Sequence, residues 1–228
     1  MKFEKLIHGK LIKRYKRFLA DIILDNGETI TAHVPNSGAM TSCIEENCDV
    51  WVSHHDDAKR KLKYTLELTK IKDNLICTNT NIANKIAIEA IQNKTIKELQ
   101  NYTSLKPEQK YGQNSRIDIL LENENQKCYV EVKSVSLKIN NSLAFPDAVT
   151  SRGTKHLKEL ESMIKDGHRA VMLYIIQRDD NLPFRLACEI DKKYCESFNE
   201  ARKNGVEVLV YQSKINFEEI FVSNKKEF

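Results

Sequence analysis

The chain has 228 residues, of which 41% are apolar and 30% are charged, so it can bury a sizeable core. Seven glycines and four prolines exclude a collagen-like, linker-like or disordered chain. The net charge of +4 is uneven: residues 1–20 carry seven Lys or Arg and one Glu, which leaves the remainder slightly acidic. No membrane span or secretory signal is visible, so we expect a cytoplasmic protein with no membrane partner.

The first eighty residues have the pattern of a small β-barrel. Short segments rich in β-branched or aromatic residues are separated by turn signals at 25–27 and 35–38. These segments are LADIIL (19–24), ETITAHV (28–34), DVWVS (49–53), KLKYTLELT (61–69) and LICT (75–78). Five strands in this length favour a barrel of the oligonucleotide-binding (OB) type.

The N-terminal segment interleaves basic and aromatic side chains. The basic residues are Lys13, Arg14, Lys16 and Arg17, and a second basic cluster follows at 59–63. A barrel strand of this composition can follow phosphates with its cations and stack bases on an aromatic ring. We therefore predict nucleic-acid binding here, with Phe18 itself in the barrel core.

Six cysteines are scattered along the chain, and in a reducing compartment we expect free thiols that act as small core residues. Cys43, Cys48, His54 and His55 offer four nitrogen or sulfur ligands. Their spacing matches no common structural zinc pattern, so we do not predict a zinc site.

After residue 80, strands alternate with helices, which indicates an α/β domain. The segments, in order, are a helix at 81–94, strands at 115–122 and 128–135, a helix near 154–166, a strand at 169–177, a helix near 191–204 and a strand at 206–212. We predict two domains, 1–80 and 81–228, which pack closely because no flexible linker separates them.

The two strands at 115–122 and 128–135 carry the most informative pattern. The polar loop between them predicts a hairpin, in which residues whose numbers sum to 249 face each other. Asp118 then lies opposite Glu131, where two like charges are unfavourable unless a cation binds them. Lys133 shares the face of Glu131 and is placed to act on an attacking water. This chemistry suits phosphodiester hydrolysis assisted by Mg²⁺ or Mn²⁺.

Two further helices carry candidate residues. Glu89 falls on the stripe of Ile82 and Ile86, where it is either a third metal ligand or one half of a salt bridge. In the helix near 154–166, His156 lies at the margin of the apolar arc, so we expect a semi-buried residue with a satisfied hydrogen bond rather than a metal ligand.

The spacing of Asp118 and Glu131-Val132-Lys133 resembles the PD-(D/E)xK nuclease core. Longer segments are similar to the sugar fermentation stimulation protein A family over nearly the whole chain: LIKRYKRFLADI (11–22), TAHVPNSGAM (31–40), KRKLKYTLEL (59–68), YGQNSRID (111–118), YVEVKSVSL (129–137) and FPDAVTSRGTKHLKEL (145–160). Two loops depart from the family pattern, with Ser37 in place of Thr and Asn47-Cys48 in place of Pro-Gly.

This resemblance implies an N-terminal OB-type barrel, a nuclease-like α/β domain with a mixed sheet, and DNA binding linked to sugar metabolism. By position, Glu89, Asp118, Glu131 and Lys133 match the family's nuclease-like site, and Arg152 and Lys155 match its phosphate-contacting motif. We therefore predict sequence-nonspecific DNA binding with a metal-dependent nuclease site. The alternatives are a non-catalytic DNA-binding regulator of sugar (maltose-type) metabolism and a binding protein that responds to a small molecule.

Overall fold

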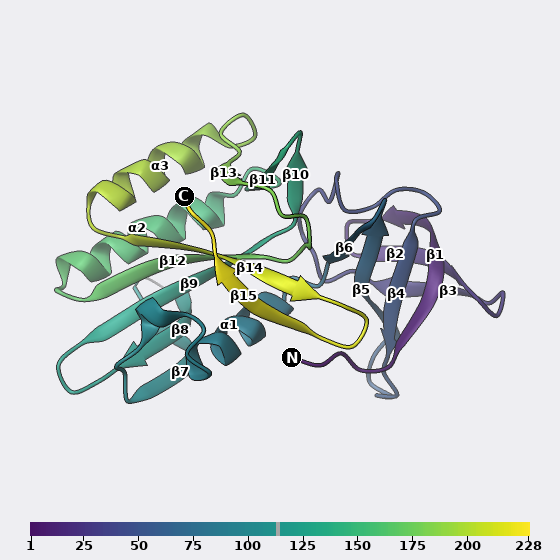
Figure 1. Cartoon of the computed structure of the whole chain (residues 1–228), viewed down its shortest axis with the longest axis horizontal. Coiled ribbons are helices and arrows are strands. Elements are labelled where there is room, and N and C mark those ends of the chain that lie inside the picture. The colour runs from purple at the N-terminus through teal and green to yellow at the C-terminus, as the bar shows by residue number, and fades with distance from the viewer. Residues whose placement is uncertain (113–114) are drawn as a thin grey trace.

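The computed structural model describes residues 1–112 and 115–228, so Gln113 and Asn114 of the YGQNSRID segment lie outside the described residues. A β-barrel and a larger α/β domain lie side by side (Figure 1). This confirms the predicted fold class. Within the described ranges, no helix is long and apolar enough to cross a membrane.

The barrel is built from the strands β1 (Leu6–Tyr15), β2 (Leu19–Leu24), β3 (Thr29–His33), β4 (Asp49–His54), β5 (Tyr64–Ile71) and β6 (Asn74–Cys77). They are ordered β3-β2-β1-β4-β5-β6, and a parallel pairing between β3 and β5 closes the first five into a barrel. Each predicted β-segment overlaps one strand, β2 to β6 in order. Inward positions alternate along β2, where Ala20, Ile22 and Leu24 are buried, as expected for a sheet with one face in a core.

The described residues of the α/β domain form three helices, α1 (Ile82–Gln92), α2 (Ser151–Lys165) and α3 (Lys192–Lys203), and a short 3₁₀ turn, η1 (Lys97–Leu99). Its strands are β7 (Ser104–Tyr111), β8 (Ser115–Glu122), β9 (Lys127–Val135), β10 (Leu137–Ile139), β11 (Ser142–Phe145), β12 (Arg169–Ile176), β13 (Phe184–Leu186), β14 (Glu207–Ile215) and β15 (Ile220–Lys225). The main mixed sheet is ordered β15-β14-β12-β9-β8-β7, and β10, β11 and β13 form a small second sheet.

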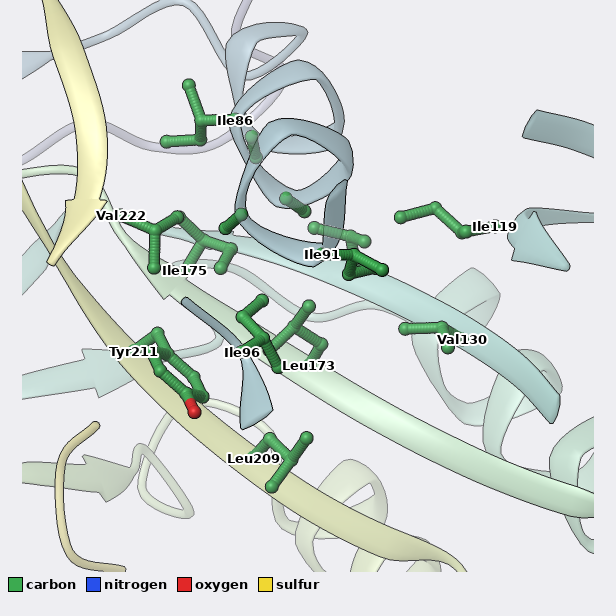
Figure 2. Packing of buried hydrophobic residues seen from close by; sticks show 14 of the residues in the cluster. Ile86, Ile91, Ile96, Ile119, Val130, Leu173, Ile175, Leu209, Tyr211 and Val222 are labelled. Atoms are coloured by element: carbon green, nitrogen blue, oxygen red, sulfur yellow. The ribbon is translucent and has the colours of Figure 1, made fainter. Parts of the chain in front are cut away.

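Both faces of the main sheet are covered. Along β12, Val171, Leu173 and Ile175 belong to the cluster that packs under α1 (Figure 2), whereas Met172 and Tyr174 belong to the cluster under α2 and α3. This arrangement explains why β12 is a continuous apolar run without polar alternation. It also places β8 and β9 inside the sheet, as their apolar neighbours predicted.

The sequence analysis missed the edge strands and one covalent bond. β7 contains Pro107, which suits an edge position, and its mostly exposed residues lack a clear apolar period. Cys188 and Cys195 form a disulfide that ties the preceding loop to α3, so the expectation of six free thiols is wrong for this pair. Their Cα atoms lie 5.6 Å apart, within the reach of a disulfide. The other four cysteines are free, as expected.

The two domains are joined by backbone and by a buried charge. β6 pairs with β5, and its far side bonds to the chain after β12: Cys77 N–H donates to Gln177 O at 2.8 Å, and Leu75 O accepts from Asp179 N–H at 3.1 Å. Beside this contact, Arg178 is only 2% exposed. Its guanidinium donates to Asp180 Oδ1 at 2.6 Å and to Ser136 O at 2.7 Å within the α/β domain. It also reaches the barrel, where Ser42 O and Ser42 Oγ each accept at 3.4 Å.

We expect Arg178→Met to destabilise the protein by about 3–5 kcal/mol, because it leaves the buried Asp180 carboxylate without its main partner. Urea unfolding measures this loss. Arg185→Ala is the matched control, since the Arg185–Glu189 pair is exposed to solvent and its loss costs less than about 1 kcal/mol. Equal effects of the two substitutions would contradict a structural role for the buried pair.

Candidate functional site

A pocket of about 390 Å³ opens where the two domains meet. Its walls come from the barrel turn at Arg17 and loop 36–38, the beginning of α1, the facing ends of β8 and β9, and segment 144–153. Asp118, Glu131 and Lys133 all line it. The structure therefore brings together three of the four predicted catalytic residues, in a cavity that neither domain forms alone.

The hairpin register is confirmed. β8 and β9 pair from Ile119–Val130 to Glu122–Lys127, so that paired numbers sum to 249. At Asp118 the carboxylate, rather than the backbone, bonds to the neighbouring strand: its Oδ2 accepts the N–H of Val132 at 2.8 Å. Its Oδ1 accepts a hydrogen bond from Asn84 Nδ2 of α1 at 2.9 Å. These two donors orient the carboxylate at the pocket wall.

Glu131 is almost completely buried, with 2% of its surface exposed. Its Oε1 accepts from Lys133 Nζ at 2.6 Å and contacts Nδ1 of His156. His156 is itself buried and hydrogen-bonded, which confirms the expectation of a satisfied residue, and Arg152 Nε donates to its other ring nitrogen at 3.3 Å. Glu131 Oε2 is buried without a hydrogen-bond partner among the described residues.

The two carboxyl groups differ in their readiness to ionise. Burial raises the pKa of Asp118 above its usual value, and the nearby Glu131 raises it further. Burial also acts to raise the pKa of Glu131, but Lys133 and His156 together outweigh burial and lower it. The ionised form is therefore favoured at Glu131 and disfavoured at Asp118.

These features fit a small divalent cation. The described part of the chain contains no group of three or more His, Cys, Asp or Glu side chains arranged to hold a metal, so the ligand set would be the two carboxylates of Asp118 and Glu131. Mg²⁺ suits such a set because it keeps several waters and binds through one or two carboxylates plus substrate phosphates. A bound cation would give the unpartnered Glu131 Oε2 a ligand, and it would favour the ionised form of Asp118, whose pKa is raised without it.

The placement of Glu89 beside these acids is wrong. Its half-exposed carboxylate binds the amino group of Met1 at 2.6 Å, so the salt-bridge interpretation is the correct one. On α1, Glu89 lies five residues after Asn84, which turns it about 140° around the helix axis. Asn84 of α1 donates a hydrogen bond to Asp118 instead, and the apolar stripe gave no signal for it.

The predicted phosphate-binding residues divide into two groups. Arg17 and Arg152 are exposed and line the pocket. Outside the pocket lining, Lys13 lies 3.9 Å from the Asp21 carboxylate, Lys16 is exposed in the turn after β1, and Lys155 lies 3.6 Å from Glu159 Oε1. In the second basic cluster, Arg60 donates to Thr65 Oγ1 and lines a different pocket.

Arg14 has a structural position that the sequence analysis missed. Its guanidinium donates to four backbone carbonyls, those of Arg17, Asn36, Gly38 and Ala39, at 2.8–3.1 Å. These bonds occupy the donors that were predicted to contact phosphates. Arg14 instead ties the β1–β2 turn to loop 36–39, and so positions two walls of the pocket.

Asp147 closes the same wall from the other domain and was not predicted. Its carboxylate accepts backbone N–H groups of Met40 and Ala39, and burial raises its pKa. The carboxylate fills the space where a Cβ on Gly38 would stand, so only glycine fits there. The TAHVPNSGAM and FPDAVTSRG segments each showed a family signature, but only the fold shows that they touch.

Two family models match the chain. One described as the SfsA N-terminal OB domain matches residues 12–78, and one described as the sugar fermentation stimulation protein RE domain matches residues 81–219. A sugar fermentation stimulation protein homolog from Marinomonas sp. (strain MWYL1) is 51% identical over 220 residues, which cover 95% of this chain and 85% of that relative. The homolog from Pelagibacter ubique (strain HTCC1062) is 47% identical over 227 residues, covering 99% and 97%.

A solved structure supports the fold. The structure of Pyrococcus furiosus SfsA in complex with Ca²⁺ superposes with a TM-score of 0.89 and covers 99% of this chain and 96% of that one. The two sequences are 24% identical, so the likeness concerns the arrangement of both domains.

The opposite pKa shifts of the two acids predict different effects on stability in metal-free buffer. The raised pKa of Asp118 means that its contribution to stability is lost as pH rises from the ordinary aspartate range through that raised pKa, so the melting temperature should fall less over this pH range in Asp118→Asn than in the wild type. Glu131→Gln leaves the Lys133 ammonium without its carboxylate and should cost about 3–5 kcal/mol. Thermal unfolding in EDTA over this pH range checks both effects, and stabilisation by Glu131→Gln would contradict this electrostatic description.

Proposed function

The chain belongs to the sugar fermentation stimulation protein family, and we propose that it binds DNA without sequence preference and hydrolyses phosphodiester bonds with the help of a divalent metal ion. One observation carries the proposal. Asp118 and Glu131 lie in a pocket between an OB-type barrel and an α/β domain, with arginines at its wall and an unpartnered carboxylate oxygen inside.

In this proposal, Asp118 and Glu131 hold Mg²⁺ or Mn²⁺, as the donor chemistry allows. The bound ion supplies polarisation of the scissile phosphate and a lowered pKa of a coordinated water. Lys133 keeps Glu131 ionised through the 2.6 Å ion pair and adds positive charge where negative charge develops. His156, in contact with the same oxygen, holds the Glu131 side chain in one orientation. The SfsA structure of Pyrococcus furiosus, solved with Ca²⁺, supports a divalent-metal site in the family.

We propose a division of labour between residues 1–80, which hold the nucleic acid, and residues 81–228, which carry the chemistry. Arg17 lines the pocket from the barrel and Arg152 lines it from the α/β domain, and both suit the phosphates on either side of the scissile bond. Contacts of this kind carry no sequence information, which is why we propose binding without sequence preference. We place this activity in the cytoplasm, where chromosomal and plasmid DNA are accessible.

The alternative proposal is a DNA-binding regulator of sugar metabolism that retains the fold without cutting. It keeps the arginines and the barrel but assigns the buried Glu131, Lys133 and His156 cluster to stability alone. Cleavage assays separate the two proposals.

We expect plasmid or single-stranded DNA to be cut in Mg²⁺ or Mn²⁺ but not in EDTA. Asp118→Ala removes a metal ligand and Lys133→Ala removes the charge that stabilises the transition state, so each should lower the cleavage rate at least about 100-fold. Gel assays of cleavage and gel-shift assays of binding are run on the same samples.

Lys158→Ala is the matched control for Lys133→Ala, because it removes an exposed lysine of α2 that lies outside the pocket lining, and it should cut at close to the wild-type rate. Binding without cutting under every metal would contradict the hydrolase and support the regulator. Binding that does not weaken as salt rises would contradict both, since phosphate contacts release counterions.

Metal binding should be measurable without any substrate. We expect Mg²⁺, Mn²⁺ or Ca²⁺ at millimolar concentration to raise the melting temperature of the wild type, because a ligand that binds only the folded state stabilises it. The shift should shrink as pH falls towards the raised pKa of Asp118, since a protonated carboxyl is a poor ligand. Asp118→Asn should abolish the shift, and an undiminished shift in that variant would place the metal elsewhere.

A further inference from the structure

Two exposed apolar side chains belong to chain segments that form the pocket walls, one on each domain. Phe18, which the sequence analysis placed in the barrel core, is 43% exposed, and Val149 is 77% exposed. Single exposed apolar residues are normal on protein surfaces. These two differ because of the segments that carry them: Val149 lines the catalytic pocket, and Phe18 directly follows Arg17, which lines it.

The turn that carries Phe18 is held in a defined shape. Lys16 and Arg17 both have positive φ values, 47° and 66°, as in the primed turns that join twisted antiparallel strands. Arg14 Nε donates to Arg17 O at 2.8 Å, and Val34 N–H donates to Phe18 O at 2.8 Å. The turn is thus anchored on both sides without a ligand, and its exposed ring is presented by a fixed backbone.

The segment that carries Val149 is anchored just as firmly. Before it, Asp147 binds the backbone of the barrel loop at Met40 and Ala39. After it, Thr150 caps α2 by accepting the N–H of Gly153 at 3.0 Å, and its own N–H donates to Asp191 at 2.8 Å. Val149 therefore projects from between two fixed points.

We propose that the site takes single-stranded nucleic acid, with a base stacked on Phe18, a neighbouring base or sugar against Val149, and phosphates at Arg17 and Arg152. The proposal rests on the proposed function and names its substrate class. An aromatic ring beside a cationic groove is the arrangement by which proteins bind single strands, because every unpaired base offers its flat face. In a duplex those faces are stacked inside the helix, and only base edges and phosphates are exposed.

The depth of the acids supports the same substrate. Glu131 is 2% exposed and Asp118 is partly buried, so a scissile phosphate has to enter the pocket to approach them. An unpaired strand can bend its backbone into such a pocket, whereas a duplex brings its complementary strand with it. Stacking tolerates any base, which agrees with binding that lacks sequence preference.

The test compares a labelled 12-nucleotide single strand with the corresponding duplex by fluorescence anisotropy in EDTA, where metal-dependent cutting is suppressed. Loss of one stacking contact is worth about 1–3 kcal/mol, so Phe18→Ala should weaken single-strand binding about 5- to 150-fold. Phe18→Tyr should restore most of the affinity. Duplex affinity should change less than twofold in both variants.

Phe221→Ala is the matched control, because Phe221 is similarly exposed, at 38%, but lies on β15 away from this pocket. It should leave both affinities unchanged. Because Phe18 is exposed, Phe18→Ala should also retain the wild-type melting temperature, which excludes loss of folding as the cause.

Unchanged single-strand affinity in Phe18→Ala, or an equal loss for both nucleic acids, would overturn the proposal, as would the absence of binding to either form at low salt. The outcome is separable from that of the proposed function. Single-strand selectivity that depends on Phe18, with no cleavage in any metal, would contradict the hydrolase and leave this inference standing. Cleavage of duplex and single strand at equal rates would leave the hydrolase and overturn the inference.

Discussion

The buried guanidinium of Arg178 is the interaction on which the site depends, because it fastens the barrel to the α/β domain. It is almost completely enclosed, and it binds Asp180 and the carbonyl of Ser136 in the α/β domain and Ser42 in the barrel, beside the hydrogen bonds that β6 makes between the domains. A buried charge of this kind is unfavourable unless every donor is satisfied, so it selects one relative placement of the domains. The pocket takes its walls from both domains and exists only in that placement.

Two other side chains act at the same joint through backbone groups. Arg14 of the barrel donates hydrogen bonds to backbone carbonyls of loop 36–39. Asp147 of the α/β domain accepts the backbone N–H groups of Ala39 and Met40 in the same loop. Together they position loop 36–40 against the site without contributing to its chemistry. Inside the pocket, Lys133 and His156 lower the pKa of Glu131, whereas burial and Glu131 raise the pKa of Asp118. Perturbed pKa values of this kind cluster at functional sites.

Much of the fold could be predicted because it depends on local patterns. The apolar period of the barrel strands, the hairpin register of β8 and β9, and the continuous apolar run of β12 all follow from side-chain alternation and burial. Edge strands such as β7 were not predicted, because most of their residues are not buried and their sequence therefore lacks the alternation of apolar and polar residues. The disulfide between Cys188 and Cys195 was not predicted, because the number of cysteines in a sequence does not show which of them lie close together in the fold.

For the site, the sequence by itself determined that Asp118, Glu131 and Lys133 share one hairpin, since period-two alternation and a symmetric loop fix which residues face each other. Only the tertiary structure decided what surrounds them. It turned Glu89 towards Met1 and brought Asn84 to Asp118, because the rotation of a buried helix is set by packing. It directed Arg14 to carbonyls and Phe18 to solvent, because turn geometry, rather than residue type, decides where those side chains point.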